Sequence, residues 1–160
     1  MNNKYYLTTP IYYVNAAPHI GHTYTTLVAD TIKRLKAMQG IEAYLVTGSD
    51  EHGLKIQRAA AKMGMTPQDY TDIIAAEFQQ TWQQLGFAID KFQRTTSPQH
   101  AAAVAKLFDA CQASGSVYKG SYTGYYSVTA EAFVPDAKAG DVDPDSGQPL
   151  EPVSYTHLTL

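Results

Sequence analysis

Residues 9–22 read Thr-Pro-Ile-Tyr-Tyr-Val-Asn-Ala-Ala-Pro-His-Ile-Gly-His, and they join an apolar strand (Tyr5 to Leu7) to a helical pattern that begins near His22. The first N–H groups of a helix have no partner within it and the helix dipole is positive at that end, so this turn favours an anion, above all a phosphate. Gly21 carries no Cβ and lets a ligand approach the backbone closely. His19 and His22 add two side-chain donors whose charge adjusts near neutral pH. The stretch therefore predicts a site for a triphosphate.

A short signature and its flanks carry a family resemblance. The motif His-Ile-Gly-His at 19–22 follows a strand and resembles the HIGH signature of class I aminoacyl-tRNA synthetases. The sequence Thr-Thr-Pro-Ile-Tyr-Tyr-Val-Asn-Ala-Ala-Pro precedes it, and Thr-Gly-Ser-Asp-Glu-His-Gly follows at 47–53. Both flanks look like the methionyl members of that class. The likeness runs from about Lys4 to about Pro152, so it covers nearly the whole chain.

The resemblance implies a ligase that activates methionine with ATP and Mg²⁺ to methionyl adenylate and passes the methionyl group to tRNA(Met). Three residues are implied at the ATP phosphates, and the two histidines among them are also the implied catalytic groups: His19, Gly21 and His22. Three residues are implied at the amino acid: Ile11, Tyr13 and Asp50. Two further candidates are a ligand contact and a residue that orients the second motif: Asn15 and His52. No dedicated protein ligand for Mg²⁺ stands out.

Each of these assignments has a simpler alternative. Both histidines could merely cap the helix or form hydrogen bonds within the turn. Asp50 could be the N-cap of the helix that follows it. The resemblance instead places Asp50 on the ammonium group of the amino acid, where a carboxylate offsets the cost of burying a positive charge. Ile11 and Tyr13 could simply pack at the end of a strand. The matched flanks favour the ligand-binding roles.

Composition indicates a soluble globular protein, with 44% hydrophobic and 17% charged residues in a chain of 160. No apolar run approaches the roughly 20 residues that span a bilayer, and the first residues show no signal-peptide pattern, so no membrane association and a cytoplasmic location are expected. The single Cys111 has no disulfide partner within the chain. A net charge of −3 argues against a basic nucleic-acid-binding face. The length suits one domain and is too short for a whole synthetase.

Strands and helices alternate over residues 1–115, which predicts an α/β fold, the N-terminal half of a Rossmann-like nucleotide-binding domain with a mostly parallel sheet. The expected strands are residues 4–9, 43–47 and 91–95. The middle strand is a continuous apolar run between glycines, so we expect it to be buried on both faces and to neighbour the first strand.

Three helices with an apolar face are expected in this half, besides the one that would follow Asp50. In the first, from His22 to Gln39, the inward face is set by the apolar residues Val28, Ile32 and Leu35. The second follows an N-cap at Thr66, and its apolar stripe predicts core residues: Ile74, Phe78, Trp82 and Leu85. The third opens at Ser97-Pro98 and turns one face inward: Val104, Leu107, Phe108 and Cys111.

A change of character near residue 115 predicts a domain boundary. Tyrosines and β-formers from Val117 onward indicate short antiparallel strands, and the resemblance assigns residues 116–154 to the start of a β-rich connective-peptide insertion. Many relatives carry a Cys-x-x-Cys zinc pair in this insertion, whereas Ser127 and Ala130 occupy those positions here, so we expect no zinc and no other metal site in the segment. Residues 155–160 do not continue the resemblance and are expected to be a non-native tail outside the fold.

The sequence is therefore interpreted as the N-terminal part of a methionyl-tRNA synthetase catalytic domain. Two alternatives stay open at this point. One is an inactive truncated fragment that at most binds ATP or methionine weakly. The other is a small adenylate-forming nucleotidyltransferase, against which both flanking motifs speak.

Overall fold

The computed structural model describes the backbone of residues 4–159 and the side chains of residues 4–154. Two compact units make up the chain, Met1–Ala101 and Ala102–Leu160. The division falls inside the helix Pro98–Ala113 (α4), and thus before the boundary near residue 115 that the sequence predicts. α4 has no buried residue, so burial gives this helix no part in a core.

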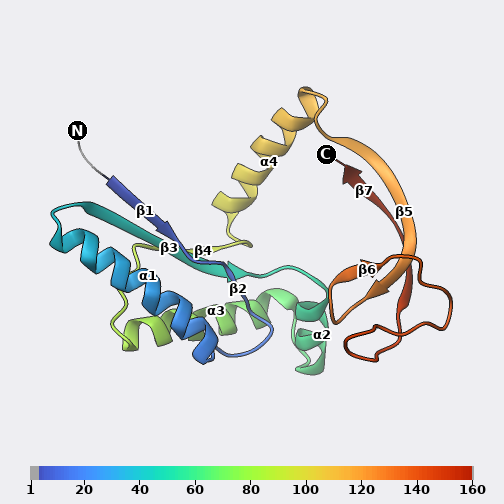
Figure 1. The fold of residues 1–160 in the computed structure, drawn as a ribbon, viewed down its shortest axis with the longest axis horizontal. Coiled ribbons are helices and arrows are strands. Elements are labelled where there is room, and N and C mark those ends of the chain that lie inside the picture. The colour runs from blue at the N-terminus through green and yellow to red at the C-terminus, as the bar shows by residue number, and fades with distance from the viewer. Residues whose placement is uncertain (1–3, 160) are drawn as a thin grey trace. The chain divides into compact units, whose positions relative to one another are not determined.

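A four-stranded parallel sheet forms the centre of the first unit (Figure 1). Its strands are Lys4–Thr8 (β1), Tyr12–Tyr13 (β2), Glu42–Asp50 (β3) and Lys91–Arg94 (β4). Val46 of β3 pairs with both Thr8 and Lys91, and Ser49, which also pairs with β4, pairs with Tyr12. β1 and β2 therefore follow one another along one edge of β3, and β4 lies along the other edge. The predictions of a parallel sheet and of neighbouring first and second expected strands are confirmed.

Three helices accompany this sheet: Ile20–Met38 (α1), Leu54–Lys62 (α2) and Pro67–Gln84 (α3). Tyr12 shows that α1 and α3 lie on the same face of the sheet. Its hydroxyl is 2.8 Å from Oγ1 of Thr26 in α1, and its ring centroid is 5.7 Å from that of Phe78 in α3. Two crossovers on one face of parallel strands that advance in one direction make a Rossmann-like half-domain. α1 starts slightly earlier than predicted, so His22 lies within its first turn.

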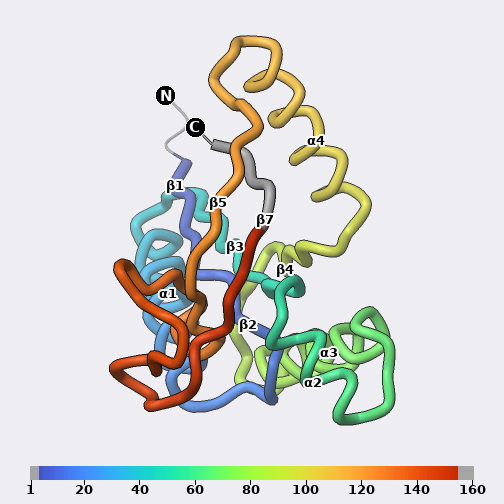
Figure 2. The backbone as a smooth tube through the Cα atoms, turned by 90° about the vertical axis from the view of Figure 1, so that its right-hand side faces the viewer, coloured from blue at the N-terminus to red at the C-terminus, as the bar shows by residue number. Residues whose placement is uncertain are grey.

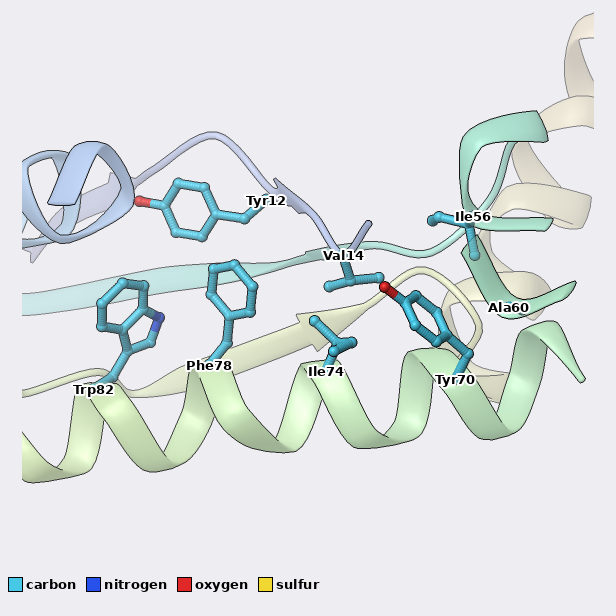
Figure 3. Close-up of a cluster of buried hydrophobic side chains, with 8 residues drawn as sticks. All are labelled: Tyr12, Val14, Ile56, Ala60, Tyr70, Ile74, Phe78 and Trp82. Atoms are coloured by element: carbon cyan, nitrogen blue, oxygen red, sulfur yellow. The ribbon is translucent and has the colours of Figure 1, made fainter. Parts of the chain in front are cut away.

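The core of the first unit fills the space between α3 and the sheet (Figure 3). Phe78 and Trp82 project from α3 toward Tyr12, whose hydroxyl reaches α1, and their ring centroids are 5.7 Å apart. The predicted stripe is confirmed for its buried members Ile74, Phe78 and Trp82. It is wrong for Leu85, which is 50% exposed because α3 ends at Gln84 and Leu85 is its C-cap.

The inward face of α1 is not the predicted apolar one. Its buried residues are Thr26, Ala29 and Asp30. Val28 and Leu35 are exposed by 43% and 50%. Lys33 Nζ instead donates to the carbonyl oxygen of Ala88 at 2.5 Å, and the amide of Ala88 donates to Asp30 Oδ1 at 2.7 Å. Hydrogen bonds hold this face, and a count of apolar residues does not reveal them.

β3 is not buried on both faces, contrary to the prediction for residues 43–47. Leu45 and Thr47 are buried, whereas Tyr44, which alternates with them, is 37% exposed. The reason is that α1 and α3 both cover the same face of the sheet. Among the residues described here, no helix buries the opposite face at Tyr44.

The second unit consists of α4 and an antiparallel sheet. Its strands are Tyr118–Ser127 (β5), Ala132–Val134 (β6) and Glu151–Thr159 (β7), in the order β6-β5-β7. β5 and β7 run side by side in both views (Figures 1 and 2) and pair over their length, from Tyr118 with Thr159 to Tyr126 with Glu151. The antiparallel prediction is confirmed, although β5 and β7 are longer than expected.

Two expectations for this part of the chain need correction. Val104 and Leu107 of α4 do not face inward but are 51% and 68% exposed, since no apolar surface covers them in the described residues. The expectation that residues 155–160 lie outside the fold also differs from the structure, because the backbone of β7 extends to Thr159 through its hydrogen bonds with β5.

Candidate functional site

The first histidine motif folds into a reciprocal cap at the start of α1. His19 is the N-cap residue, and its Nδ1 accepts a hydrogen bond from the amide of Gly21 at 3.1 Å. The Nδ1 of His22 in turn accepts from the amide of His19 at 3.2 Å. The two imidazole rings stack with their centroids 3.7 Å apart. The capping interpretation of these histidines is thus correct as far as their Nδ1 atoms are concerned.

The cap uses only the Nδ1 atoms, so the Nε2 atoms of both rings can form hydrogen bonds with a ligand. A neutral imidazole whose Nδ1 accepts a hydrogen bond carries its proton on Nε2, so each ring can donate from that atom. Partial burial against Tyr12 and Phe78, at centroid distances of 4.9 and 5.1 Å, lowers the pKa of His22, and the charge of His19 lowers it further. His22 is therefore neutral at pH 7, and its Nε2–H is a neutral donor.

Gly21 serves this cap as much as any ligand. A Cβ at this position would lie 3.0 Å from Cε1 and 3.1 Å from Nδ1 of His19, so a side chain would crowd the imidazole that folds back over the first turn. The amides of His19 and Gly21 are already paired, so the part of the sequence prediction that assigns unpaired N–H groups of this turn to a phosphate does not hold for these two amides. The donors that remain at this end include the two Nε2–H groups.

The second motif forms the loop that leaves β3. Asp50 is the last residue of β3, and its Oδ1 accepts a long hydrogen bond of 3.5 Å from the amide of His52. The hydroxyl of Tyr13 donates to the carbonyl oxygen of His52 at 2.9 Å. Gly53 has φ +117°, and a Cβ there would lie 2.1 Å from the Tyr13 hydroxyl oxygen, so only glycine allows this contact.

Asp50 is not a helix cap. The helix after this loop, α2, begins at Leu54, its N-cap is Gly53, and no side chain caps it. The alternative that Asp50 serves as an N-cap is therefore wrong. The half-buried carboxylate of Asp50, at the end of β3, therefore does not stabilise a helix start.

β2 links the two motifs. The ring of Tyr12 packs on His22, and the next residue, Tyr13, pairs with Asp50 in the sheet. Both motifs follow the carboxyl ends of parallel strands, where open α/β sheets bind their ligands. The structure therefore brings His19, Gly21 and His22 together, and it brings Tyr13, Asp50 and His52 together.

Ile11 and Asn15 stand apart from these two groups. Ile11 lies between β1 and β2 and is 44% exposed. The carbonyl oxygen of Asn15 accepts from the hydroxyl of Tyr70 at 2.8 Å, which fastens the turn before α1 to α3. Within residues 4–154, the side chain of Asn15 forms no hydrogen bond with either histidine or with Asp50. Their roles at a ligand stay predictions.

Sequence reasoning missed Glu51, the buried residue beside Asp50. Its side chain is fully buried and accepts hydrogen bonds from Nε and Nη2 of Arg94, at 2.7 and 3.0 Å, and from the hydroxyls of Ser49 and Thr96. Burial opposes ionisation, but the hydrogen bonds from Arg94, Ser49 and Thr96 outweigh it, so the pKa of Glu51 lies below its usual range. The signal available was alternation: Ser49 and Glu51 lie on the same side of the strand end.

Ser127 and Ala130, the positions at which the resemblance implies a zinc pair in other family members, form a hydrogen-bonded turn. Oγ of the buried Ser127 accepts from the amide of Ala130 at 3.0 Å. In the part of the chain that the structure describes, no group of three or more His, Cys, Asp or Glu could hold a metal ion. The same part contains no helix that is long and apolar enough to cross a membrane.

Solved structures share this arrangement of sheet, helix and loops. The methionyl-tRNA synthetase of Mycobacterium tuberculosis, in complex with methionyl-adenylate, matches with a TM-score of 0.88 and 34% identity over 98% of this chain and 32% of that chain. A LeuRS of Agrobacterium radiobacter K84 matches with a TM-score of 0.77 at 24% identity, which shows the fold alone. The fold is that of the nucleotide-binding domain of class I aminoacyl-tRNA synthetases.

The sequence narrows this class further. The family model described as tRNA synthetases class I (M) matches residues 5–147, so the chain belongs to the methionyl family of these enzymes. A methionine-tRNA ligase of Clostridium acetobutylicum is 44% identical over 92% of this chain, and one of Thermosynechococcus vestitus is 48% identical over 83%. The chain spans about a quarter of the length of these relatives, 23% and 25%. Membership of this family excludes the small nucleotidyltransferase.

Proposed function

We propose that this chain is the N-terminal part of a methionyl-tRNA synthetase, which activates methionine with ATP to methionyl adenylate and transfers the methionyl group to tRNA(Met). The observation that supports it best is the pairing of the capped histidine turn with the Asp50 loop through β2. The methionyl-adenylate bound by the relative from M. tuberculosis is a molecule with the same two parts, an adenylate and an amino acid.

In the proposed first step, the carboxylate of methionine attacks the α-phosphorus of ATP and the bond to pyrophosphate breaks. Negative charge gathers on the phosphate oxygens in the transition state, so donors placed at those oxygens accelerate the step. The Nε2–H groups of His19 and His22 and the positive end of α1 are suited to this task. The neutral state of His22 lets it donate at pH 7 without a proton transfer. Mg²⁺ bound with ATP would supply further neutralisation of the phosphate charge.

Asp50 is proposed to hold the ammonium group of methionine, with Tyr13 and the backbone of Ile11 beside the amino acid. Its carboxylate sits at the end of β3 and is half-buried, so a charge-assisted hydrogen bond there is stronger than in water. Tyr13 pairs with Asp50 in the sheet and is tied to the same loop through the carbonyl of His52. In the second step, a hydroxyl of the terminal ribose of tRNA attacks the adenylate carbonyl and releases AMP.

A second candidate is that these 160 residues alone bind ATP or methionine weakly and catalyse nothing. The exposure of Tyr44 on the sheet face opposite α1 and α3 favours it, because a Rossmann-like sheet is normally covered on both faces. The chain alone is then expected to show no methionine-dependent exchange of pyrophosphate with ATP. Exchange clearly above an empty-vector control would overturn this second candidate.

A substitution that keeps the cap but removes the imidazole tests the proposed function in a full-length enzyme that contains this chain. His19→Asn retains an N-cap residue, since asparagine caps well, yet its shorter amide does not reach where the Nε2–H lies. We expect adenylate formation to slow by about 10²-fold or more, with thermal stability and methionine KM nearly unchanged. His100→Ala is the matched control and should be neutral. Normal exchange by the His19 variant would show that this histidine only caps the helix.

A further inference from the structure

An ion pair between the fully buried Glu51 and the partly exposed Arg94 lies next to the proposed amino-acid site. Glu51 follows Asp50 in the chain, and its carboxylate receives a bidentate pair of hydrogen bonds from Arg94 at the end of β4, at 2.7 and 3.0 Å. Nη2 of Arg94 also pairs with Asp72 of α3 at 2.5 Å. The amide of Glu51 donates to Oγ1 of Thr95 at 2.9 Å. One residue of the loop is thus fastened to β4 and, through Arg94, to α3.

Alternation along the strand end relates this ion pair to the ligand side. Ser49 and Glu51 share one side and hydrogen-bond to each other at 2.5 Å, so Asp50 between them lies on the other side. Along the β2 edge of β3, opposite the edge occupied by β4, the loop is held by the Tyr13 hydroxyl on the His52 carbonyl and by the amide of Val14 on the Asp50 carbonyl, at 2.9 and 3.4 Å. The Asp50 backbone is therefore clamped from two directions, and the Arg94 side supplies the only charged contacts among the described residues of this clamp.

We propose that the Glu51–Arg94 ion pair is a positioning device for the known family reaction, which holds the Asp50 carboxylate where it meets the ammonium group of the amino acid. The inference rests on the proposed function of Asp50. Glu51 and Arg94 do not contact the substrate; they act through the backbone of residue 50.

The chemistry of the pair fits a positioning role better than a role in stability alone. Two charges taken out of water are often no more stabilising than apolar residues of the same size, but a bidentate guanidinium–carboxylate pair fixes distance and angle together. A lysine at residue 94 would keep the charge and lose the fork geometry. Arg94→Lys should therefore loosen the loop without leaving Glu51 unpaired.

A double-mutant cycle in the full-length enzyme tests the inference, with methionine dissociation constants measured below the melting temperature of every variant. Arg94→Lys should weaken methionine binding by about 10- to 100-fold, because small misplacements of a binding group are costly, while ATP KM changes less than about twofold. In an Asp50→Asn background the same Arg94→Lys change should have almost no further effect, since the charge being positioned is already absent. Arg34→Lys, in the ion pair with Asp30 on α1, is the matched control and should leave methionine binding unchanged.

The outcomes separate the inference from the function on which it rests. An equal loss of methionine affinity from Arg94→Lys in both backgrounds, or no loss in either, overturns the positioning role. If Asp50→Asn alone leaves methionine binding intact, the role proposed for Asp50 fails first, and that result is visible without the Arg94 variants. Should Arg94→Lys fail to fold, Glu51→Gln is the second variant: it keeps the size of the side chain but replaces one acceptor oxygen by an NH2 donor, so the bidentate pair with Arg94 is lost. It is expected to show the same dependence on Asp50, and the absence of that dependence would overturn the inference.

Discussion

Each of the two units of this chain is stabilised by a different kind of interaction. In the first, aromatic and aliphatic side chains form one buried cluster between α3 and the sheet, with Phe78 and Trp82 almost completely buried (Figure 3). In the second, the buried side chains within the described range are two polar residues and one apolar residue: Ser127, Asp143 and Leu150. Asp143 Oδ1 accepts from the amide and hydroxyl of Ser146 at 2.6 and 2.7 Å.

This difference shows where a rigid site can be built. A well-packed apolar core fixes the neighbouring backbone to within fractions of an ångström. The proposed phosphate-binding histidine His22 is in direct contact with this core, because its ring and that of Tyr12 pack on Phe78. The second unit relies on hydrogen bonds of turns, each of which contributes little net stability because water competes for it. Changes to the core should therefore be felt throughout the first unit, whereas changes to the turns of the second should stay local.

The largest expected effect comes from Phe78→Ala, which empties the centre of the cluster. Removal of a fully buried phenylalanine typically costs about 3–5 kcal/mol of unfolding free energy, a large part of what a domain of this size possesses. Chemical denaturation followed by tryptophan fluorescence, with Trp82 as the probe, measures the loss. Ile73→Ala, on the same helix but 46% exposed, is the control and should cost much less. Similar losses in both variants would mean that the cluster is not the core.

A smaller effect is expected from Gly53→Ala, at the loop that carries Asp50. The added Cβ would be strained at φ +117° and would collide with the Tyr13 hydroxyl at 2.1 Å, so about 1–3 kcal/mol should be lost. Gly64→Ala is the matched control, because Gly64 has φ +67° but no atom within 4 Å of its Cβ. Thermal melts compare the two. Equal costs would show that the Tyr13 contact is unimportant and that only backbone strain matters.

Titration with acid should change the structure of the second unit only around Asp143. Hydrogen bonds from Ser127 and Ser146 lower the pKa of Asp143 from 3.8 to about 2. A depressed carboxyl pKa means that its contribution is complete above the unfolded value of 3.8 and is lost as the pH falls through about 2. The amides of Asp145 and Ser146 donate hydrogen bonds to the Asp143 carboxylate, so their NMR resonances should shift with a midpoint near pH 2. The same resonances should show no such shift in the Asp143→Asn variant. A midpoint at the ordinary aspartate value would contradict the network.

The smallest expected effect is that of a chelator, because Ser127 and Ala130, which are not zinc ligands, occupy the positions at which the resemblance implies a Cys-x-x-Cys pair. Metal analysis of the purified chain, after removal of any affinity tag, should find well under one zinc per molecule, and circular dichroism should not change on addition of EDTA. Stoichiometric zinc would mean that histidines had been recruited, and the roles given to His19 and His22 would need revision.

Local patterns in the sequence predicted the parallel sheet, the Thr66 cap and most of the α3 stripe, because each depends on neighbouring residues and on helix or strand periodicity. The buried face of α1 could not be predicted in this way, since it is held by Asp30 and Lys33, whose partners near Ala88 lie far along the chain. The exposure of Leu85 and of the α4 residues likewise depends on where helices end and on what covers them.

In the candidate site, too, local sequence patterns identify the residues but not their long-range contacts. The signature residues could be named from the motif and its flanks, but their geometry could not: the sequence does not state that the Nδ1 atoms of both histidines are used in the cap. The part played by Glu51 was missed because the residues that satisfy it come from much later in the chain, Arg94 from the end of β4 and Thr96 from the turn after it. Alternation places Ser49 and Glu51 on one side of the strand end, but no local pattern names the distant partners of Glu51.

Asp50 is proposed to provide the charge that holds the amino acid, and methionine titration of Asp50→Asn in the full-length enzyme tests this role most directly. The substitution keeps the shape and removes the counter-ion from a half-buried position, so methionine affinity should fall by about 2–5 kcal/mol while ATP binding and thermal stability change far less. Since α2 is capped at Gly53, no loss of a helix cap can account for such a fall. Unchanged methionine affinity in the folded variant would contradict the account and remove Asp50 from the site.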